Sequence, residues 1–292
     1  MRIAAFGDIH SNHFALEACL EHAQRLGIDG VAFLGDFVTD CPNPQKTLAL
    51  IREIAEKYPT WQIRGNREEY LMAHARNADD GWREGSRTGS LLYTYENLTR
   101  EDISAFERIP IDRIVRIDGQ EPFEICHGAP WQTRYMLLPG TREADEVLKS
   151  MRTRLLLCAH THSAFVLEKD GKVIVNGGAV GAPSNGCADA GYILIESVGG
   201  HWIPRLARVK YDFESAIREF FDTDFVSKAN VWAKAVAASM RTGRNYPQEC
   251  IKMVECDSVR LGVSMDCEAL WERAASTLEI QHAIGDFRRG TG

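Results

Sequence analysis

The chain has 292 residues, of which 45% are hydrophobic and 26% are charged, and its formal net charge is −7. This composition is typical of a globular protein with enough residues to bury a full core, in one large domain or two. The acidic balance, with no run of Lys and Arg, counts against non-specific binding to nucleic acid.

The cysteines and the lengths of the apolar runs indicate the cellular compartment of the protein. Eight cysteines occur along the chain without the Cys-x-x-Cys spacing of a structural zinc site. The longest apolar runs are too short to span a bilayer, and the chain opens directly on a strand-like run without a signal-peptide pattern. We therefore expect a cytoplasmic protein with reduced thiols and no membrane partner.

The first part of the chain alternates strand-like and helix-like patterns. Short apolar runs predict strands at 2–8, 29–36 and 60–66, and apolar residues at helical spacing predict helices at 13–27 and 44–58. This βαβαβ order predicts a parallel sheet covered by helices.

The segment 67–110 is helical and more polar, and it is much longer than a sheet crossover requires. Long excursions of this kind often form the wall of a site, so we expect a helical insertion near the functional site. Strands follow, and the turn at 168–173 predicts a hairpin between two of them. The expected strands lie at 111–118, 121–126, 154–158, 163–168, 172–176, 190–197 and 201–209.

From residue 211 onward the pattern is helical, with helices expected at 213–222, 226–240, 247–255 and 267–284. We predict an α/β core domain at 1–210 and a helical C-terminal extension at 211–292. The core should be a four-layer sandwich, in which two mixed sheets pack face to face with helices outside.

Polar side chains follow the ends of five predicted strands. Ligands bind beyond the carboxyl ends of strands in α/β sheets, so these side chains should gather at one edge. Imidazole and carboxylate together suit Mn, Fe, Zn or Ni. The side chains with metal-binding atoms are Asp8, His10, Asp36, Asn66, His127, His160 and His162.

These segments match a known signature in order. The sequence resembles the calcineurin-like metallophosphoesterase superfamily, whose blocks are Asp-x-His, Gly-Asp-x-x, Gly-Asn-x-Asp/Glu, His-Gly and Gly-His-Thr-His. The blocks lie between residues 8 and 162, and the likeness continues through 176–183. One departure is that Ala159 replaces the leading glycine of the last block. The chain is most similar to small bacterial and archaeal phosphodiesterase-like members, including longer ones with a helical C-terminal extension.

The resemblance implies two divalent transition metal ions, with manganese favoured and iron, zinc or nickel as alternatives. It implies catalysis by attack of a metal-bridging hydroxide on phosphorus, with Asp36, Asn66 and His127 taking part. It assigns one ion to Asp8, His10 and His162, the other to Asn66, His127 and His160, and the bridging position to Asp36.

Position 67 departs from the pattern of many phosphatases in the superfamily, which have a histidine there as proton donor. Arg67 does not deprotonate in proteins and so is no general acid. It could instead hold a phosphate oxygen as a catalytic and substrate-binding residue. The alternative is a surface arginine paired with Glu68 or Glu69.

Two residues after the first metal motif are candidates for substrate contact. Asn12 and His13 begin a predicted helix, and helix N-termini favour anions. Asn12 could equally serve as a helix cap, and His13 as a solvated residue of the first turn. Asp40, just beyond Asp36, is expected to orient a metal ligand.

These observations predict a phosphoesterase that hydrolyses a phosphodiester or a phosphoanhydride. The partner is then a small phosphorylated substrate, with a nucleotide as one option; the sequence does not specify an oligomeric state. A phosphomonoesterase acting on nucleotides or phosphoproteins is the first alternative. A catalytically weak metal-binding regulatory or scaffold module is the second, and a nuclease is disfavoured by the absence of a basic groove.

Overall fold

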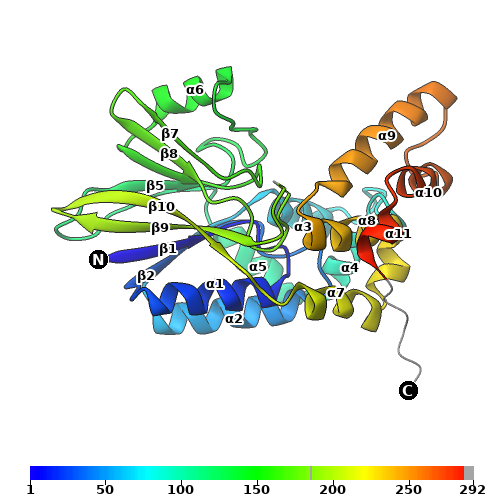
Figure 1. The fold of residues 1–292 in the computed structure, drawn as a ribbon, viewed down its shortest axis with the longest axis horizontal. Helices are drawn as coiled ribbons and strands as arrows, with labels where there is room; N and C mark the ends of the chain where they lie inside the picture. Colours follow the sequence, from blue (N-terminus) through cyan, green and yellow to red (C-terminus); the bar gives the residue numbers. More distant parts are fainter. Residues whose placement is uncertain (185, 286–292) are drawn as a thin grey trace.

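The computed structural model describes residues 1–184 and 186–285. Its core contains two five-stranded mixed sheets (Figure 1). The first sheet has the order β10-β9-β1-β2-β3, with β1, β2 and β3 parallel and β9 antiparallel to β1. Its strands are β1 (Arg2–Phe6), β2 (Gly30–Leu34), β3 (Thr60–Ile63), β9 (Ala190–Val198) and β10 (His201–Val209).

The second sheet has the order β4-β5-β6-β8-β7, in which β5, β6 and β8 are parallel and the two edge strands are antiparallel. The predicted hairpin at 168–173 joins β7 to β8, and both Asp170 and Gly171 have positive φ. Its strands are β4 (Asp112–Val115), β5 (Phe123–Cys126), β6 (Leu155–Cys158), β7 (Phe165–Lys169) and β8 (Lys172–Asn176).

The two sheets pack face to face around an apolar layer. Ile3 and Ala32 of the first sheet belong to one buried cluster with Ile125 and Leu157 of the second. Trp202 of β10 is fully buried in this layer, where its ring makes an edge contact with Phe123. Alternation along the strands thus gives each sheet one face toward this central layer.

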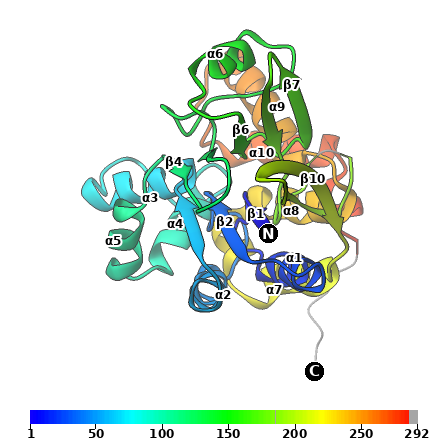
Figure 2. The same ribbon diagram turned by 90° about the vertical axis from the view of Figure 1, so that its left-hand side faces the viewer.

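Helices cover the outer faces of both sheets (Figure 2). Helices α1 (His13–Arg25) and α2 (Pro44–Lys57) pack their apolar sides against Phe6 and Phe33 of the first sheet. Helix α6 (Arg142–Ser150) packs against Leu156 of the second sheet. The predicted four-layer α/β sandwich is therefore confirmed.

The segment between β3 and β4 is helical, as predicted for 67–110. It contains α3 (Asn66–Arg76), α4 (Gly89–Glu96) and α5 (Arg100–Arg108). Only Arg64 and Gly65 separate the end of β3 from the start of α3, so the first turn of α3 lies at the edge where the strands end. This arrangement connects the insertion to the candidate site.

The C-terminal segment is also helical and stands at the end of the sandwich (Figure 1). Its own apolar cluster includes Phe220, Val236 and Trp271, and it extends to Tyr93 of α4. No helix in the described ranges is both long and apolar enough to cross a bilayer. The helices are α7 (Phe213–Asp222), α8 (Phe225–Thr242), α9 (Tyr246–Leu261), α10 (Glu268–Thr277) and α11 (Ile280–Ile284).

Two local features differ from the sequence-based expectation. Helix α6 was not predicted, although Thr141 caps it and its apolar side is buried. The single helix expected at 267–284 is divided into α10 and α11, because Glu279 lies in the left-handed region with φ of 51°. A non-glycine residue in that region ends a right-handed helix.

Candidate metal centre

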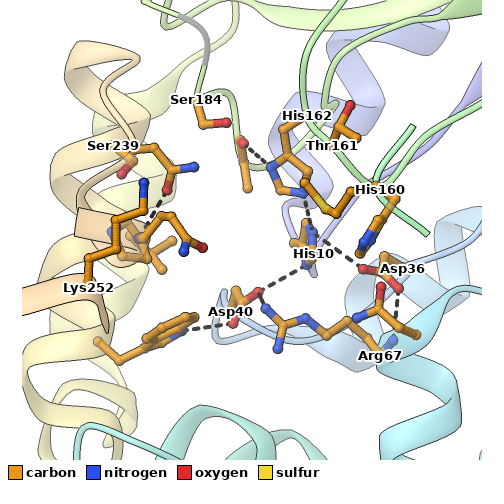
Figure 3. A pocket seen from close by; sticks show the side chains of 18 residues that line it. His10, Asp36, Asp40, Arg67, His160, Thr161, His162, Ser184, Ser239 and Lys252 are labelled. Carbon is orange, nitrogen blue, oxygen red and sulfur yellow. Dashed lines mark hydrogen bonds and ion pairs between the residues drawn. The ribbon is translucent and has the colours of Figure 1, made fainter. Parts of the chain in front are cut away.

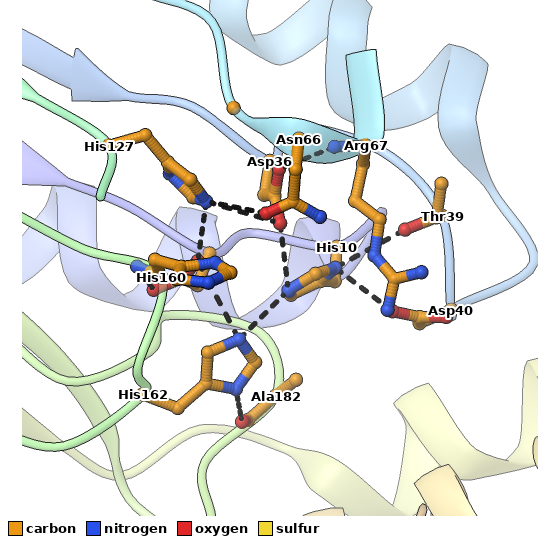
Figure 4. A network of polar contacts seen from close by, with 12 residues as sticks. His10, Asp36, Thr39, Asp40, Asn66, Arg67, His127, His160, His162 and Ala182 are labelled. Atoms are coloured by element: carbon orange, nitrogen blue, oxygen red, sulfur yellow. Dashed lines mark hydrogen bonds and ion pairs between the residues drawn. The ribbon is translucent and has the colours of Figure 1, made fainter. Parts of the chain in front are cut away.

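The ends of five strands deliver polar side chains to one edge of the sandwich (Figure 4). Loops after β1, β2, β5 and β6 and the first turn of α3 supply all seven side chains predicted from the sequence. The structure therefore brings the predicted set together. Its members are Asp8, His10, Asp36, Asn66, His127, His160 and His162.

One group of ligand atoms consists of Asp8, His10 and His162, whose candidate atoms all lie within 4.8 Å of one another. The Nε2 atoms of the two histidines are 3.1 Å apart, and Nε2 of His162 is 3.6 Å from Oδ1 of Asp8. At this distance the two rings can share a hydrogen bond if one of them is protonated at Nε2, and with both Nε2 atoms unprotonated they are spaced to bind one cation.

The second group is built around His127 and also includes Asp8 and Asp36. Nε2 of His127 is 3.4 Å from Oδ2 of Asp36 and 3.2 Å from Oδ1 of Asn66. His160 lies beside this group, with its ring centroid 5.1 Å from that of His127. Asp36 also lies 3.9 Å from Nε2 of His10, so it stands between the two groups.

Hydrogen bonds on the outer side of three imidazoles fix which nitrogen faces the centre. Nδ1 of His127 is 2.7 Å from the carbonyl oxygen of Leu34, and Nδ1 of His162 is 2.8 Å from that of Ala182. Nδ1 of His10 lies 3.1 Å from Oδ2 of Asp40. A ring that donates from Nδ1 presents an unprotonated Nε2 to a metal, which is the usual arrangement of metal-binding histidines.

The backbone is strained at the same positions. Five of the seven residues have φ between 50° and 69°, in the left-handed region that non-glycine residues rarely adopt. Such strain costs roughly 1–3 kcal/mol per residue and clusters at functional sites. These residues are Asp8, His10, Asp36, His160 and His162.

Buried charges dominate the electrostatics of the centre. Burial would raise the pKa of Asp36, but the neighbouring imidazole of His127 holds it well below its usual range. Burial would lower the pKa of His127, but Asp36 and Asp8 together raise it to about 10. The carboxylates of Asp8 and Asp36 thus favour a positive charge at this position. Divalent cations would supply that charge in place of the proton on His127.

Glu68 holds two of the ligand-bearing loops together. Its fully buried carboxylate accepts hydrogen bonds from the backbone N–H groups of Asp36, Phe37 and Gly65, at 2.8–2.9 Å. Burial, followed by the charge of Asp36, raises the pKa of Glu68 to about 7. The glutamate of the Gly-Asn-x-Glu block therefore has a structural role.

Arg67 points into the centre rather than toward Glu68 or Glu69. Its guanidinium lies 2.9 Å from Oδ2 of Asp40, and its backbone N–H donates to Oδ1 of Asp36. Its Nε–H is buried and has no acceptor within the described ranges. The surface-arginine alternative is wrong, because the side chain lines the cavity beside His10 and Asp36.

The structure does not place Asn12 and His13 against substrate. Asn12 is buried, and its side chain caps α1 at Ala15 and donates to the carbonyl oxygen of Gly181. His13 faces α7, with Nε2 3.0 Å from a carboxylate oxygen of Glu219. Neither residue lines the cavity described below. The predicted substrate contacts of Asn12 and His13 are therefore wrong, and both residues have structural roles instead.

A cavity of about 550 Å³ opens over the centre (Figure 3). One wall consists of His10, Asp36, Arg67 and neighbouring site residues. The opposite wall comes from the C-terminal helices and the turn between them, a contribution that the helical pattern of this segment did not predict. That wall contains Trp232, Val236, Ser239, Asn245, Pro247, Gln248 and Lys252.

Comparison with known proteins agrees with this geometry. The family model of the calcineurin-like phosphoesterase superfamily domain matches residues 1–198. The chain belongs to the calcineurin-like phosphoesterase superfamily. An uncharacterised protein of Methanocaldococcus jannaschii is 25% identical over 229 residues, which are 73% of this chain and 89% of that protein.

Two solved structures share the fold of this chain. A hypothetical protein of Pyrococcus horikoshii is 20% identical, with a TM-score of 0.71 over 83% of this chain and 98% of that one. A metallophosphoesterase of Sphaerobacter thermophilus is 24% identical, with a TM-score of 0.64 over 81% of this chain and 99% of that one. Members of the family use divalent metals, and the two clusters of ligand atoms fit such ions.

Proposed function

We propose that this phosphoesterase hydrolyses a phosphodiester or a phosphoanhydride with two divalent metal ions. The observation that carries the proposal is Asp36, whose carboxylate stands between two groups of imidazole nitrogens. The donor set fits the ions in number and kind, since it combines carboxylate, amide and imidazole atoms. When bound, the two ions would supply a nucleophilic water at neutral pH and neutralise phosphoryl charge.

The residues of the chain then have distinct roles. Asp8, His10 and His162 would hold one ion, and His127, His160 and Asn66 the other, with Asp36 shared between them. Asp40 orients His10 from Nδ1, and the carbonyl oxygens of Leu34 and Ala182 orient His127 and His162. This outer set fixes the ring planes, so that few rearrangements are needed when substrate binds.

Arg67 is the proposed phosphate-binding residue. Its guanidinium lines the cavity and is held at one nitrogen by Asp40, and its buried Nε–H has no acceptor among the residues that the structure describes. A phosphate oxygen would accept from such donors in a charge-assisted hydrogen bond. Arg67 thus orients and neutralises the phosphoryl group but does not protonate a leaving group.

The lack of a proton donor at position 67 favours substrates with good leaving groups. General acid catalysis is typically worth about 10²–10⁴-fold, so esters of basic alcohols lose most from its absence. Aryl diesters and phosphoanhydrides, dinucleoside polyphosphates among them, need little protonation. The role of this centre is therefore hydrolysis of activated diesters or anhydrides rather than of alkyl phosphomonoesters.

The experiment is a substrate screen on metal-free protein reconstituted with Mn²⁺, Fe²⁺, Zn²⁺ or Ni²⁺. The probes are 4-nitrophenyl phosphate, bis(4-nitrophenyl) phosphate and a dinucleoside polyphosphate. Turnover of the diester or anhydride above the monoester supports the proposal. Faster turnover of the monoester would instead favour a phosphomonoesterase, and the absence of turnover with every metal would contradict an enzymatic role.

A further inference from the structure

The cavity extends well beyond the space that one phosphate group requires. Its volume of about 550 Å³ lies within the roughly 300–1,000 Å³ range of small-molecule sites. The metal ligands line only one side of it, and α8 and α9 close the other (Figure 3). A substrate that fills the cavity must therefore carry a second group, which contacts the C-terminal helices.

The chemistry of this far wall changes along its length. Trp232 lies next to the centre through its hydrogen bond to Asp40, and Val236 and Pro247 add further apolar surface to the lining. Farther along it is polar, with Ser239 and Lys252 facing the cavity across from His10 (Figure 3). A matching ligand has an apolar or aromatic linker that ends in a polar group.

The charge expected of that end group follows from Lys252. It is exposed, and its ammonium group makes no hydrogen bond or ion pair to any residue in 1–184 or 186–285. Glu249, the acidic neighbour one turn earlier on α9, is hydrogen-bonded to Arg244, and the charge of Lys252 acts on it only through space. By contrast, the carboxylates of Asp36 and Asp40 in the opposite wall are already engaged by Arg67 and the site histidines.

We propose that α8 and α9 form a second subsite in which Lys252 binds an anionic group of the substrate. The inference rests on the proposed function. It restricts the proposed substrates to phosphodiesters or phosphoanhydrides with a second anionic group. That group, a phosphate or a carboxylate, would lie on a substituent of the phosphate that reacts. Trp232 would lie along the linker, since its indole is fixed in the wall by its hydrogen bond to Asp40.

A pair of matched substrates tests the subsite. In 4-carboxyphenyl 4-nitrophenyl phosphate and its methyl ester the same nitrophenolate leaves, and only the remote charge differs. We expect wild-type kcat/KM to favour the carboxylate roughly fivefold, as for an ion pair exposed to solvent. Lys252→Met should abolish this ratio and Lys252→Glu should invert it. Lys234→Met is the control, because Lys234 lies on α8 outside the cavity lining and contacts Asn230.

Binding gives a readout that does not depend on turnover. In calorimetry on metal-loaded protein, 4-phosphonobenzoate should bind roughly fivefold more tightly than phenylphosphonate, and Lys252→Met should remove the difference. No preference in wild type, or an equal preference in Lys252→Met, would overturn the subsite. Should the preference appear in binding while neither ester is hydrolysed, the hydrolytic function fails and the subsite stands.

Discussion

The indole Nε1–H of Trp232 donates a hydrogen bond of 2.8 Å to Oδ1 of Asp40. The other oxygen of the same carboxylate lies 3.1 Å from Nδ1 of His10 and 2.9 Å from the guanidinium of Arg67. One buried carboxylate therefore joins α8 to a candidate metal ligand and to the candidate phosphate-binding arginine. The C-terminal helices are part of the site rather than an appendage to it.

The first prediction concerns this hydrogen bond. Trp232→Phe keeps an aromatic ring in the wall but leaves one oxygen of Asp40 without its indole donor. We expect kcat for bis(4-nitrophenyl) phosphate to fall about tenfold, since a hydrogen bond to a charged group contributes roughly 1.5 kcal/mol. The control is Trp271→Phe, which removes an indole donor to Met265 in the same helical segment. Equal losses in the two variants would show that the effect is only one of packing.

The second prediction concerns Arg67. If its guanidinium holds phosphate equally in the ground and transition states, Arg67→Ala raises KM and leaves kcat nearly unchanged. Wild-type rates on a series of aryl diesters should depend steeply on the pKa of the leaving group, because position 67 lacks a proton donor. Arg67→His should flatten that dependence where the imidazole reaches the leaving oxygen. A flat wild-type dependence, with chemistry rate-limiting, would mean that another group supplies the proton.

The third prediction concerns stability and pH. The carboxylate of Glu219 on α7 contacts His13 of α1 and Lys46 of α2, at 3.0 and 2.5 Å. Burial would raise the pKa of Glu219, but these two hydrogen bonds lower it below its ordinary value of 4.5. The associated stabilisation is therefore present above about pH 4.5 and is lost as the pH falls through the lowered pKa.

Glu219→Gln should accordingly reduce the free energy of unfolding by about 1 kcal/mol at pH 7. The difference from wild type should shrink below pH 4.5, which urea unfolding at a series of pH values would measure. Glu214→Gln is the matched control on the same helix, since that side chain pairs with Arg241 and not with α1 or α2. A difference for Glu219→Gln that is constant down to pH 3 would rule out this charge effect.

The sequence predicted the layered fold and the set of candidate ligands for a physical reason. Ligand-bearing blocks such as Asp8–His10 and His160–His162 follow strands, and strand ends in parallel sheets meet at one edge. The apolar runs of the strands and the helical spacing of apolar residues also predicted which side chains form the core, because both patterns are local in the sequence.

Other features depended on contacts that a sequence does not show. Asn12 was ambiguous because a helix cap and an anion contact use the same residue type at the same place. The roles of Trp232 and Glu219 depend on how α7 and α8 dock, which brings residues about 190 positions apart into contact, as between Trp232 and Asp40. The strained φ angles at the ligands likewise follow from tertiary structure, since nothing local in Asp8 or His162 requires them.

The most direct test of a two-metal phosphoesterase is a titration of metal-free protein with Mn²⁺, following hydrolysis of bis(4-nitrophenyl) phosphate by wild type and by Asp36→Asn. Asp36 carries the charge that both ion positions share, so its loss should remove most of the transition-state stabilisation. We predict that wild-type turnover rises until two equivalents are bound, and that Asp36→Asn stays folded but at least about 10³-fold slower, the scale of losing one key electrostatic contact. Saturation at one equivalent, or a near wild-type rate for metal-loaded Asp36→Asn, would contradict the account.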